Sequence, residues 1–277
     1  MSDAGAGASG DPSPDFRLEH PDPGIAVLRL NRPQRLNALT DDSVAELSRT
    51  LDQLAADTEL RVLILTGAGR GFCAGFDLTL AAQAPLAKIL GEAGAWTARQ
   101  EAFAAIVTKL RALRAPVIAA VNGPANGAGL GMALACEIRI ASTEAAFNAA
   151  FVKVGMSSCD IGVSWLLPRC VGMSRAFEIM LTGRMVGAEE AERIGLVSSV
   201  VSVDQLMPHA LEVARSIAAN SAFAVWMTKR GTWANVEAGS LQAALELENR
   251  TQVLSRTTGD LERAAHALVN RRKSGQS

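Results

Sequence analysis

The amino-acid sequence predicts a mixed α/β body followed by an α-helical region at its C-terminal end. Two short apolar runs, residues 62–66 and 117–121, have the composition of buried strands, and each runs directly into a glycine-rich turn. From residue 204 onward only helical patterns occur. We therefore divide the 277 residues into a flexible tail at 1–15, an α/β core at 16–202 and a helical region at 203–277.

The first predicted elements are a strand at residues 25–31 and a helix that begins after Thr40. The strand alternates apolar and polar residues. Thr40 is a favoured residue type at a helix N-cap, and Asp41 and Asp42 follow in the first turn, where carboxylates interact favourably with the helix dipole. Four apolar residues then fall on one face of the predicted helix: Val44, Leu47, Leu51 and Leu54.

The later elements follow from further apolar runs and from helical spacing. Besides the two buried strands, short strands are expected at residues 138–141 and 197–201. Helices are expected at residues 130–136, 174–181, 188–194, 205–218 and 222–236, and one long helix is expected from 240 toward 271.

The composition excludes several classes of function. The formal net charge is −1 and charged residues make up 20% of the chain, so a protein that chiefly grips nucleic acid or an anionic membrane is not expected. The chain has no Tyr and only 4% aromatic residues, which argues against base stacking. Residues 115–136 are uncharged, but their prolines, glycines and asparagines make a lipid-exposed helix implausible.

The cysteines and histidines suggest neither a disulfide framework nor a metal site. The four cysteines form no CxxC pair and no cluster with histidine at zinc spacing. We expect free, mostly buried thiols and a cytoplasmic protein, since the first fourteen residues lack the basic and apolar parts of a secretory signal. No metal and no cofactor are predicted.

Two glycine-rich loops, at residues 67–77 and 122–131, follow the buried strands. Neither fits the dinucleotide fingerprint, because Phe72 and Met132 stand where the third glycine belongs, and neither contains the lysine of a phosphate loop. Such turns let backbone N–H groups approach a ligand, so two of them together could form an oxyanion hole for one carbonyl oxygen. The alternative is that the glycines serve only tight turns and close packing.

Four segments occur in a characteristic order: NRPQRLNAL at 31–39, LTGAGRGFCAGFDL at 65–78, PVIAAVNGPANGAG at 116–129, and LTGR at 181–184 followed by AEEAERIGLV at 188–197. Together they resemble the crotonase (enoyl-CoA hydratase/isomerase) superfamily, from about residue 25 to the C-terminus. The resemblance implies an α/β fold in which strand–strand–helix (ββα) units form a spiral, with a C-terminal helical oligomerisation region. Homotrimers or hexamers that bind acyl-CoA thioesters are then expected.

The same resemblance assigns positions to the binding site. It implies that the backbone N–H groups of Phe76 and Ala128 form the oxyanion hole for a thioester enolate. Ala128 stands where the family often has glycine, but its N–H is retained. Arg35 matches a basic residue near the CoA phosphates, and Ala74 lies at the expected CoA-binding loop. The alternative for Arg35 is an ordinary solvated arginine.

Both glutamates of a typical family hydratase are missing, because their positions match Gly131 and Phe151. One acid remains nearby: counting back from residue 171 places Asp160 where other branches of the family have a catalytic aspartate, whereas counting forward from residue 155 gives Cys159. We prefer Asp160, whose apolar neighbours suggest burial, and a buried carboxylate usually has either a raised pKa or a partner. The alternatives are a helix N-cap for Asp160 and a nucleophilic Cys159.

The resulting hypothesis is an acyl-CoA enzyme, a hydratase-like lyase of fatty acid metabolism with Asp160 as its acid/base. The alternatives are an enoyl-CoA or dienoyl-CoA isomerase, a CoA-ester hydrolase and a catalytically silent acyl-CoA binder. The acyl pocket is expected to include Trp96, Met156 and Phe151, with Phe103 and Trp165 as further candidates. The alternative for the two tryptophans, Phe103 and Met156 is a plain place in the core.

Overall fold

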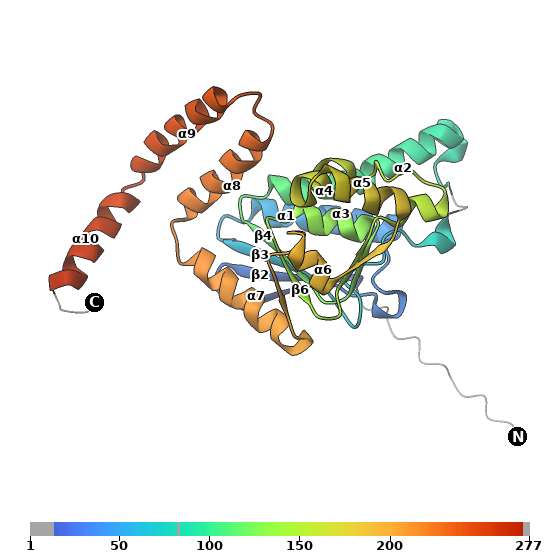
Figure 1. Ribbon diagram of the computed structural model, residues 1–277, viewed down its shortest axis with the longest axis horizontal. Coiled ribbons are helices and arrows are strands. Elements are labelled where there is room, and N and C mark those ends of the chain that lie inside the picture. Colours follow the sequence, from blue (N-terminus) through green and yellow to red (C-terminus); the bar gives the residue numbers. More distant parts are fainter. Residues whose placement is uncertain (1–13, 82–83, 274–277) are drawn as a thin grey trace, which may run out of the picture.

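The computed structural model describes residues 14–81 and 84–273, and Figure 1 shows an α/β body from which the last helices extend. The strands are β1 (Phe16–Asp22), β2 (Ile25–Leu30), β3 (Val62–Gly67), β4 (Val117–Val121), β5 (Pro124–Asn126), β6 (Ile138–Ser142), β7 (Ala146–Asn148), β8 (Met185–Gly187) and β9 (Ser199–Val201). The α-helices are α1 (Asp41–Ala56), α2 (Ala87–Ala112), α3 (Ala128–Ala135), α4 (Val163–Val171), α5 (Met173–Thr182), α6 (Ala188–Arg193), α7 (Val203–Ala218), α8 (Ala222–Val236), α9 (Leu241–Arg256) and α10 (Asp260–Lys273).

The strands form two sheets of different size. The larger has the order β1-β2-β3-β4-β6-β9 and is parallel except for the β1/β2 hairpin, and the smaller has the order β5-β7-β8. Every residue of β3 and β4 is buried. Their unbroken apolar runs are therefore those of central parallel strands that are covered on both faces.

A unit of long strand, short strand and helix repeats along the chain. In one turn β4 enters the large sheet, β5 the small sheet, and α3 follows; in the next turn the order is β6, β7 and α4. Isolated parallel bridges join Leu39 to Phe76 and Cys73 to Ala125, so the small sheet continues into the two earlier turns. This stacking is the predicted ββα spiral, and it brings equivalent loops of successive turns side by side.

Helices cover both faces of the large sheet (Figure 1). The main apolar core lies on one face and involves α1, α2, α3 and α4, whereas α7 packs on the other face through Leu206, Ala210 and Ala214. The region predicted at 203–277 therefore begins with a helix that belongs to the body. None of the helices in the described ranges combines the length and hydrophobicity needed to cross a membrane.

A buried ion pair attaches α8 to this body. The ammonium of Lys229 lies 3.1 Å from Glu137 and donates to the carbonyls of Leu110 and Ala115 at 3.2 and 3.0 Å. The other carboxylate oxygen of Glu137 accepts a hydrogen bond of 2.7 Å from the Trp233 indole. Because these charges are paired and hydrogen-bonded, their burial is tolerated.

The predicted long helix at residues 240–271 is wrong in one respect. The structure divides it into α9 and α10, with Gly259 at φ 72° in the break. Glycine adopts this left-handed conformation without the steric penalty of other residues, so the chain can change direction between the end of α9 at Arg256 and the start of α10 at Asp260.

The predicted cap of α1 provides a test of local stability. The Thr40 hydroxyl accepts from the Ser43 N–H at 3.1 Å, and the Ser43 hydroxyl accepts from the Thr40 N–H at 2.7 Å. We expect Thr40→Ala to lower the free energy of unfolding by about 1 kcal/mol, measured by urea denaturation. Thr50→Ala, within the same helix, is the control; an equal loss there would contradict a capping effect.

Candidate active site

Seven of the residues predicted from the sequence line one cavity of about 170 Å³: Ala74, Phe76, Trp96, Ala128, Phe151, Met156 and Asp160. The cavity lies where two successive turns of the spiral meet α2 and the segment before α4. Arg35, Gly131 and Trp165 are not among the lining residues. Trp165 is instead exposed on α4, where the Arg169 guanidinium lies 3.2 Å from its ring centroid, so its predicted place in the acyl pocket is wrong.

The N–H of Phe76 points away from the segment around Leu39 that pairs with it. In the parallel bridge to Leu39, the hydrogen bonds run from Leu39 N–H to Gly75 O at 2.7 Å and from Asp77 N–H to Leu39 O at 2.9 Å. The N–H of Phe76 therefore lies on the opposite side of the strand-like segment. It donates to no other residue in the described part of the chain.

The N–H of Ala128 is the first of helix α3. The first N–H groups of a helix have no partner within it, and this one donates to none of the residues described. Gly75 lies directly against it: a Cβ at Gly75 would be 3.4 Å from Ala128 N and 2.9 Å from Asn126 O. Gly75 also has φ 93°, so a larger residue would be strained there.

The two unpartnered N–H groups thus lie in neighbouring turns beside one cavity. The two segments that carry them are joined by a hydrogen bond of 2.9 Å from the Asn126 N–H to the Cys73 carbonyl oxygen. A carbonyl oxygen that gains negative charge would be stabilised by two such donors, with a further contribution from the helix N-terminus. This arrangement is what an oxyanion hole requires.

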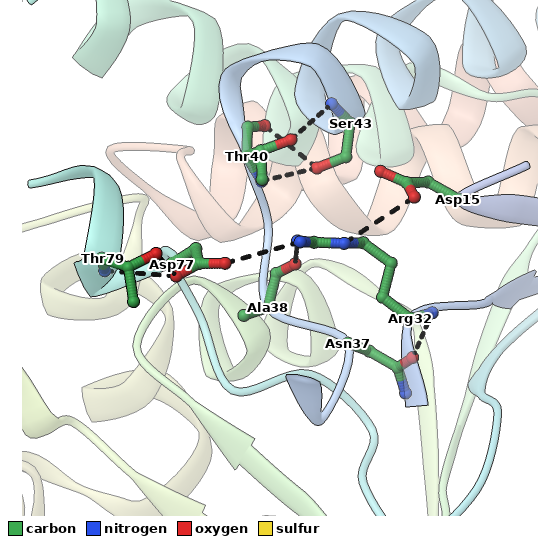
Figure 2. Close-up of polar contacts among 8 residues, drawn as sticks. All are labelled: Asp15, Arg32, Asn37, Ala38, Thr40, Ser43, Asp77 and Thr79. Carbon is green, nitrogen blue, oxygen red and sulfur yellow. Dashed lines mark hydrogen bonds and ion pairs between the residues drawn. The ribbon is translucent and has the colours of Figure 1, made fainter. Parts of the chain in front are cut away.

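A polar network surrounds Asp77, the residue that follows Phe76, and Figure 2 shows its contacts with Arg32 and Thr79. The Arg32 guanidinium donates to the Ala38 carbonyl and lies 3.5 Å from Asp77 and 3.7 Å from Asp15. Asp77 accepts from the Thr79 hydroxyl at 2.7 Å. These hydrogen bonds and the positive charge of Arg32 hold the pKa of Asp77 below its usual value. Asp77 is therefore a loop-positioning carboxylate.

Packing is close at Gly131 and Phe151, the two positions that the resemblance matches to the glutamates of a typical family hydratase. A Cβ at Gly131 would lie 2.6 Å from a side-chain carbon of Ile161 and 2.9 Å from its carbonyl oxygen, so no side chain fits there. The Phe151 ring lies against Gly127, 3.6 Å from where a Cβ would be. Ile161 has φ 42°, which is unusual for a β-branched residue and marks strain beside the cavity.

Asp160 is half-buried in the cavity wall. Burial raises the pKa of its carboxyl above the ordinary value, and hydrogen bonds from the Gln100 amide and the Ile161 N–H partly offset the rise. The N-cap alternative is wrong, because α4 begins at Val163 with Gly162 as its cap and without a side-chain capping bond. Cys159 is exposed and does not line the cavity, so the nucleophile alternative loses its support.

The contact between Gln100 and Asp160 leads to a prediction on pH dependence. Removing this hydrogen bond in Gln100→Leu takes away an interaction that favours the ionised carboxylate, so the pKa of Asp160 should rise further. If ionised Asp160 is the base, the acid limb of kcat/KM moves to higher pH. Gln53→Leu, exposed on α1, should leave the profile unchanged; an unchanged profile in Gln100→Leu would contradict the assignment.

Sequence reasoning missed Gln100 and Arg99, both on α2. Arg99 donates to Asp41 through Nε at 2.8 Å and Nη2 at 2.6 Å. Both contacts, Arg99 to Asp41 and Gln100 to Asp160, join positions far apart in the sequence, so no local motif signals them. Arg35 is exposed in the 3₁₀ helix Pro33–Arg35, and the Ala74 N–H donates to Leu36 O at 2.9 Å.

Comparison with known proteins identifies the family. A sequence model described as enoyl-CoA hydratase/isomerase matches residues 21–276. The chain belongs to this family, within the crotonase superfamily.

Three similar proteins illustrate the range of this family. The chain is 44% identical over 256 residues to a probable enoyl-CoA hydratase of Mycobacterium tuberculosis, covering 92% of this chain and 90% of the relative. It is 37% identical to the 1,2-epoxyphenylacetyl-CoA isomerase of Escherichia coli, covering 93% and 97%. A crystal structure of a probable enoyl-CoA hydratase/isomerase from Mycobacterium abscessus superposes with a TM-score of 0.87 at 38% identity, covering 93% and 96%.

Proposed function

We propose that this acyl-CoA enzyme of the hydratase/isomerase family forms a thioester enolate in the cavity. The N–H groups of Phe76 and Ala128 bind the thioester oxygen, and Asp160 transfers a proton at the adjacent carbon. One observation carries the proposal. The same largely apolar cavity is lined by Phe76 and Ala128, whose N–H groups have no partner in the described part of the chain, and by Asp160, a half-buried carboxyl with a raised pKa. A carboxyl whose pKa lies closer to neutrality is better suited to general acid–base work.

The single acid favours double-bond isomerisation. Among the described residues that line the cavity, Asp160 is the only carboxylic acid. An isomerase needs one group that takes a proton from one carbon of the substrate and returns it to another, so all atoms are conserved. Hydration requires both an activated water and a delivered proton. The hydratase-like lyase is the second candidate, and the name of the Mycobacterium tuberculosis relative favours it.

The proposed chemistry uses only backbone donors and one carboxylate, so it requires no cofactor beyond the CoA of the substrate. We propose that Arg35 binds the CoA phosphates, because its side chain is exposed next to Leu36, which accepts a hydrogen bond from the Ala74 loop. A homotrimer or hexamer is also proposed. It is supported by large apolar side chains that α9 and α10 leave exposed, such as Leu241, Val253 and Leu261.

The test is exchange of the proton next to the thioester, because every reaction through an enolate shares this step. Saturated CoA thioesters with different acyl groups are incubated with the protein in D₂O, and deuterium uptake is followed by mass spectrometry. Uptake by wild type but not by Asp160→Asn is the expected result. Tight binding of CoA thioesters without exchange would instead identify a silent binder. Supplying 3-enoyl and 2-enoyl thioesters then separates isomerisation from hydration.

A further inference from the structure

The acyl cavity is lined by a third of the chain's aromatic side chains. The sequence has eight Phe, four Trp and no Tyr, and four of these twelve line the cavity: Phe76, Trp96, Phe103 and Phe151. The apolar remainder of the wall consists of small residues, such as Gly127 and Ala150, and of the aliphatic residues Leu78, Val154, Met156 and Ile161. Four of the eight large apolar side chains that an acyl group meets are therefore aromatic rings.

Three of these rings are held in place by neighbouring side chains. Phe76 and Phe103 pack edge to face, with ring centroids 5.6 Å apart and an interplanar angle of 81°. The Arg99 guanidinium lies 4.6 Å from the Trp96 ring centroid and 5.3 Å from that of Phe76, and its pairing with Asp41 fixes it. A pocket with walls ordered before binding loses little conformational entropy when a rigid ligand enters.

The buried cation of Arg99 adds a second observation. Only 9% of its side chain is exposed, and its Nη1 is buried without a hydrogen-bond partner in the described part of the chain. Arg99 lines the cavity. An alkyl chain makes no specific electrostatic interaction with a guanidinium, whereas the π face of an aromatic ring attracts a cation.

The volume of the cavity is sufficient for one aromatic ring. Its volume is about 170 Å³, and an engineered apolar protein cavity of about 150 Å³ binds benzene. We propose, on the basis of the function proposed above, that the site takes CoA thioesters of compact aromatic acids, with the ring placed among Phe76, Trp96, Phe103 and Phe151. The oxyanion-hole donors at the same cavity put this ring close to the thioester carbonyl.

The test is calorimetric titration of the full-length protein with four thioesters: phenylacetyl-CoA, cyclohexylacetyl-CoA, butyryl-CoA and octanoyl-CoA. The first two have acyl groups of similar size and differ in aromaticity. We expect phenylacetyl-CoA to bind about threefold to tenfold more tightly than cyclohexylacetyl-CoA, as edge-to-face and cation–π contacts would give. Equal affinities, or tighter binding of octanoyl-CoA, would overturn the aromatic assignment and leave the proposed function intact. No binding of any thioester would overturn both.

Two variants locate the preference in the cavity wall. Trp96→Leu should reduce the ratio of the phenylacetyl-CoA to the cyclohexylacetyl-CoA affinity toward one. Trp165→Leu is the matched control, because Trp165 is also stacked with an arginine on a helix but lies outside the cavity. An unchanged ratio in Trp96→Leu, or an equal loss in Trp165→Leu, would contradict the proposed ring position.

Discussion

Replacing Asp160 with asparagine should lower kcat by about a hundredfold to ten-thousandfold, with little change in the affinity for CoA thioesters. Asparagine has nearly the same shape, and its amide can still contact Gln100, but it neither accepts nor releases a proton at neutral pH. The rate is measured by deuterium exchange next to the thioester, and the affinity by calorimetry. Asp57→Asn, at an exposed carboxylate after α1, is the control.

The raised pKa of Asp160 also predicts how the unfolding temperature of Asp160→Asn compares with that of wild type at different pH. Because the pKa is raised in the folded state, the protonated carboxyl is the form that the fold favours. The corresponding stabilisation is present at low pH and is lost as the pH rises through the folded-state pKa. The neutral variant should therefore unfold at the same or a higher temperature than wild type at pH 7, and the difference should shrink on acidification. A lower Tm at pH 7 would mean that lost activity reflects damage to the fold.

Replacing Ala128 with proline should lower kcat by about a hundredfold to a thousandfold, because it removes one of the two N–H groups that we propose as the oxyanion hole. The backbone accepts this change unusually well. Proline is favoured at the first position of a helix, and Ala128 is the first residue of α3. The preceding Gly127 has ψ −112°, the mirror image of the extended conformation that a residue before proline prefers, and it has no Cβ to clash.

A matched variant separates the donor from the side chain. Ala128→Gly keeps the N–H and removes only a methyl group, so its kcat should stay close to that of wild type. Circular dichroism and Tm show whether the proline variant keeps the fold. If Ala128→Pro retains full activity, or if Ala128→Gly loses as much, then the Ala128 N–H is not the donor.

The buried elements were predictable because their patterns are local. The apolar runs of β3 and β4, the cap at Thr40 and the buried face of α1 match the structure closely. The strand β1 was not predicted, because five of its seven residues are exposed on an edge strand and its sequence is mostly polar. β5, β7 and β8 have three residues each, which is too short for alternation to be recognised. The break before α10 did carry a signal, Gly259, which the helical pattern on both sides obscured.

The part of the site that is marked by local sequence motifs could be predicted. Phe76, Ala128 and Asp160 were located from motifs and counting, and the structure places all three at one cavity. What could not be predicted comes from tertiary contacts: Gln100 on Asp160, Arg99 between two rings, and Ile161 in the space beside Gly131. The sequence shows no glutamate at Gly131, but the reason that no side chain fits there, the contact with Ile161, appears only in three dimensions.

The two proposed enolate-binding donors are main-chain atoms supplied by successive turns of the spiral. Their position depends on backbone hydrogen bonds and on close approach at Gly75, not on the identity of the side chains that carry them. Substrate choice thus depends on side chains, whereas bond activation depends on backbone N–H groups, even at Phe76, which contributes to both. Mutational drift at Trp96, Phe103 or Phe151 can reshape the acyl wall while the activating amides stay in place, which gives such a scaffold a high capacity to evolve new substrates.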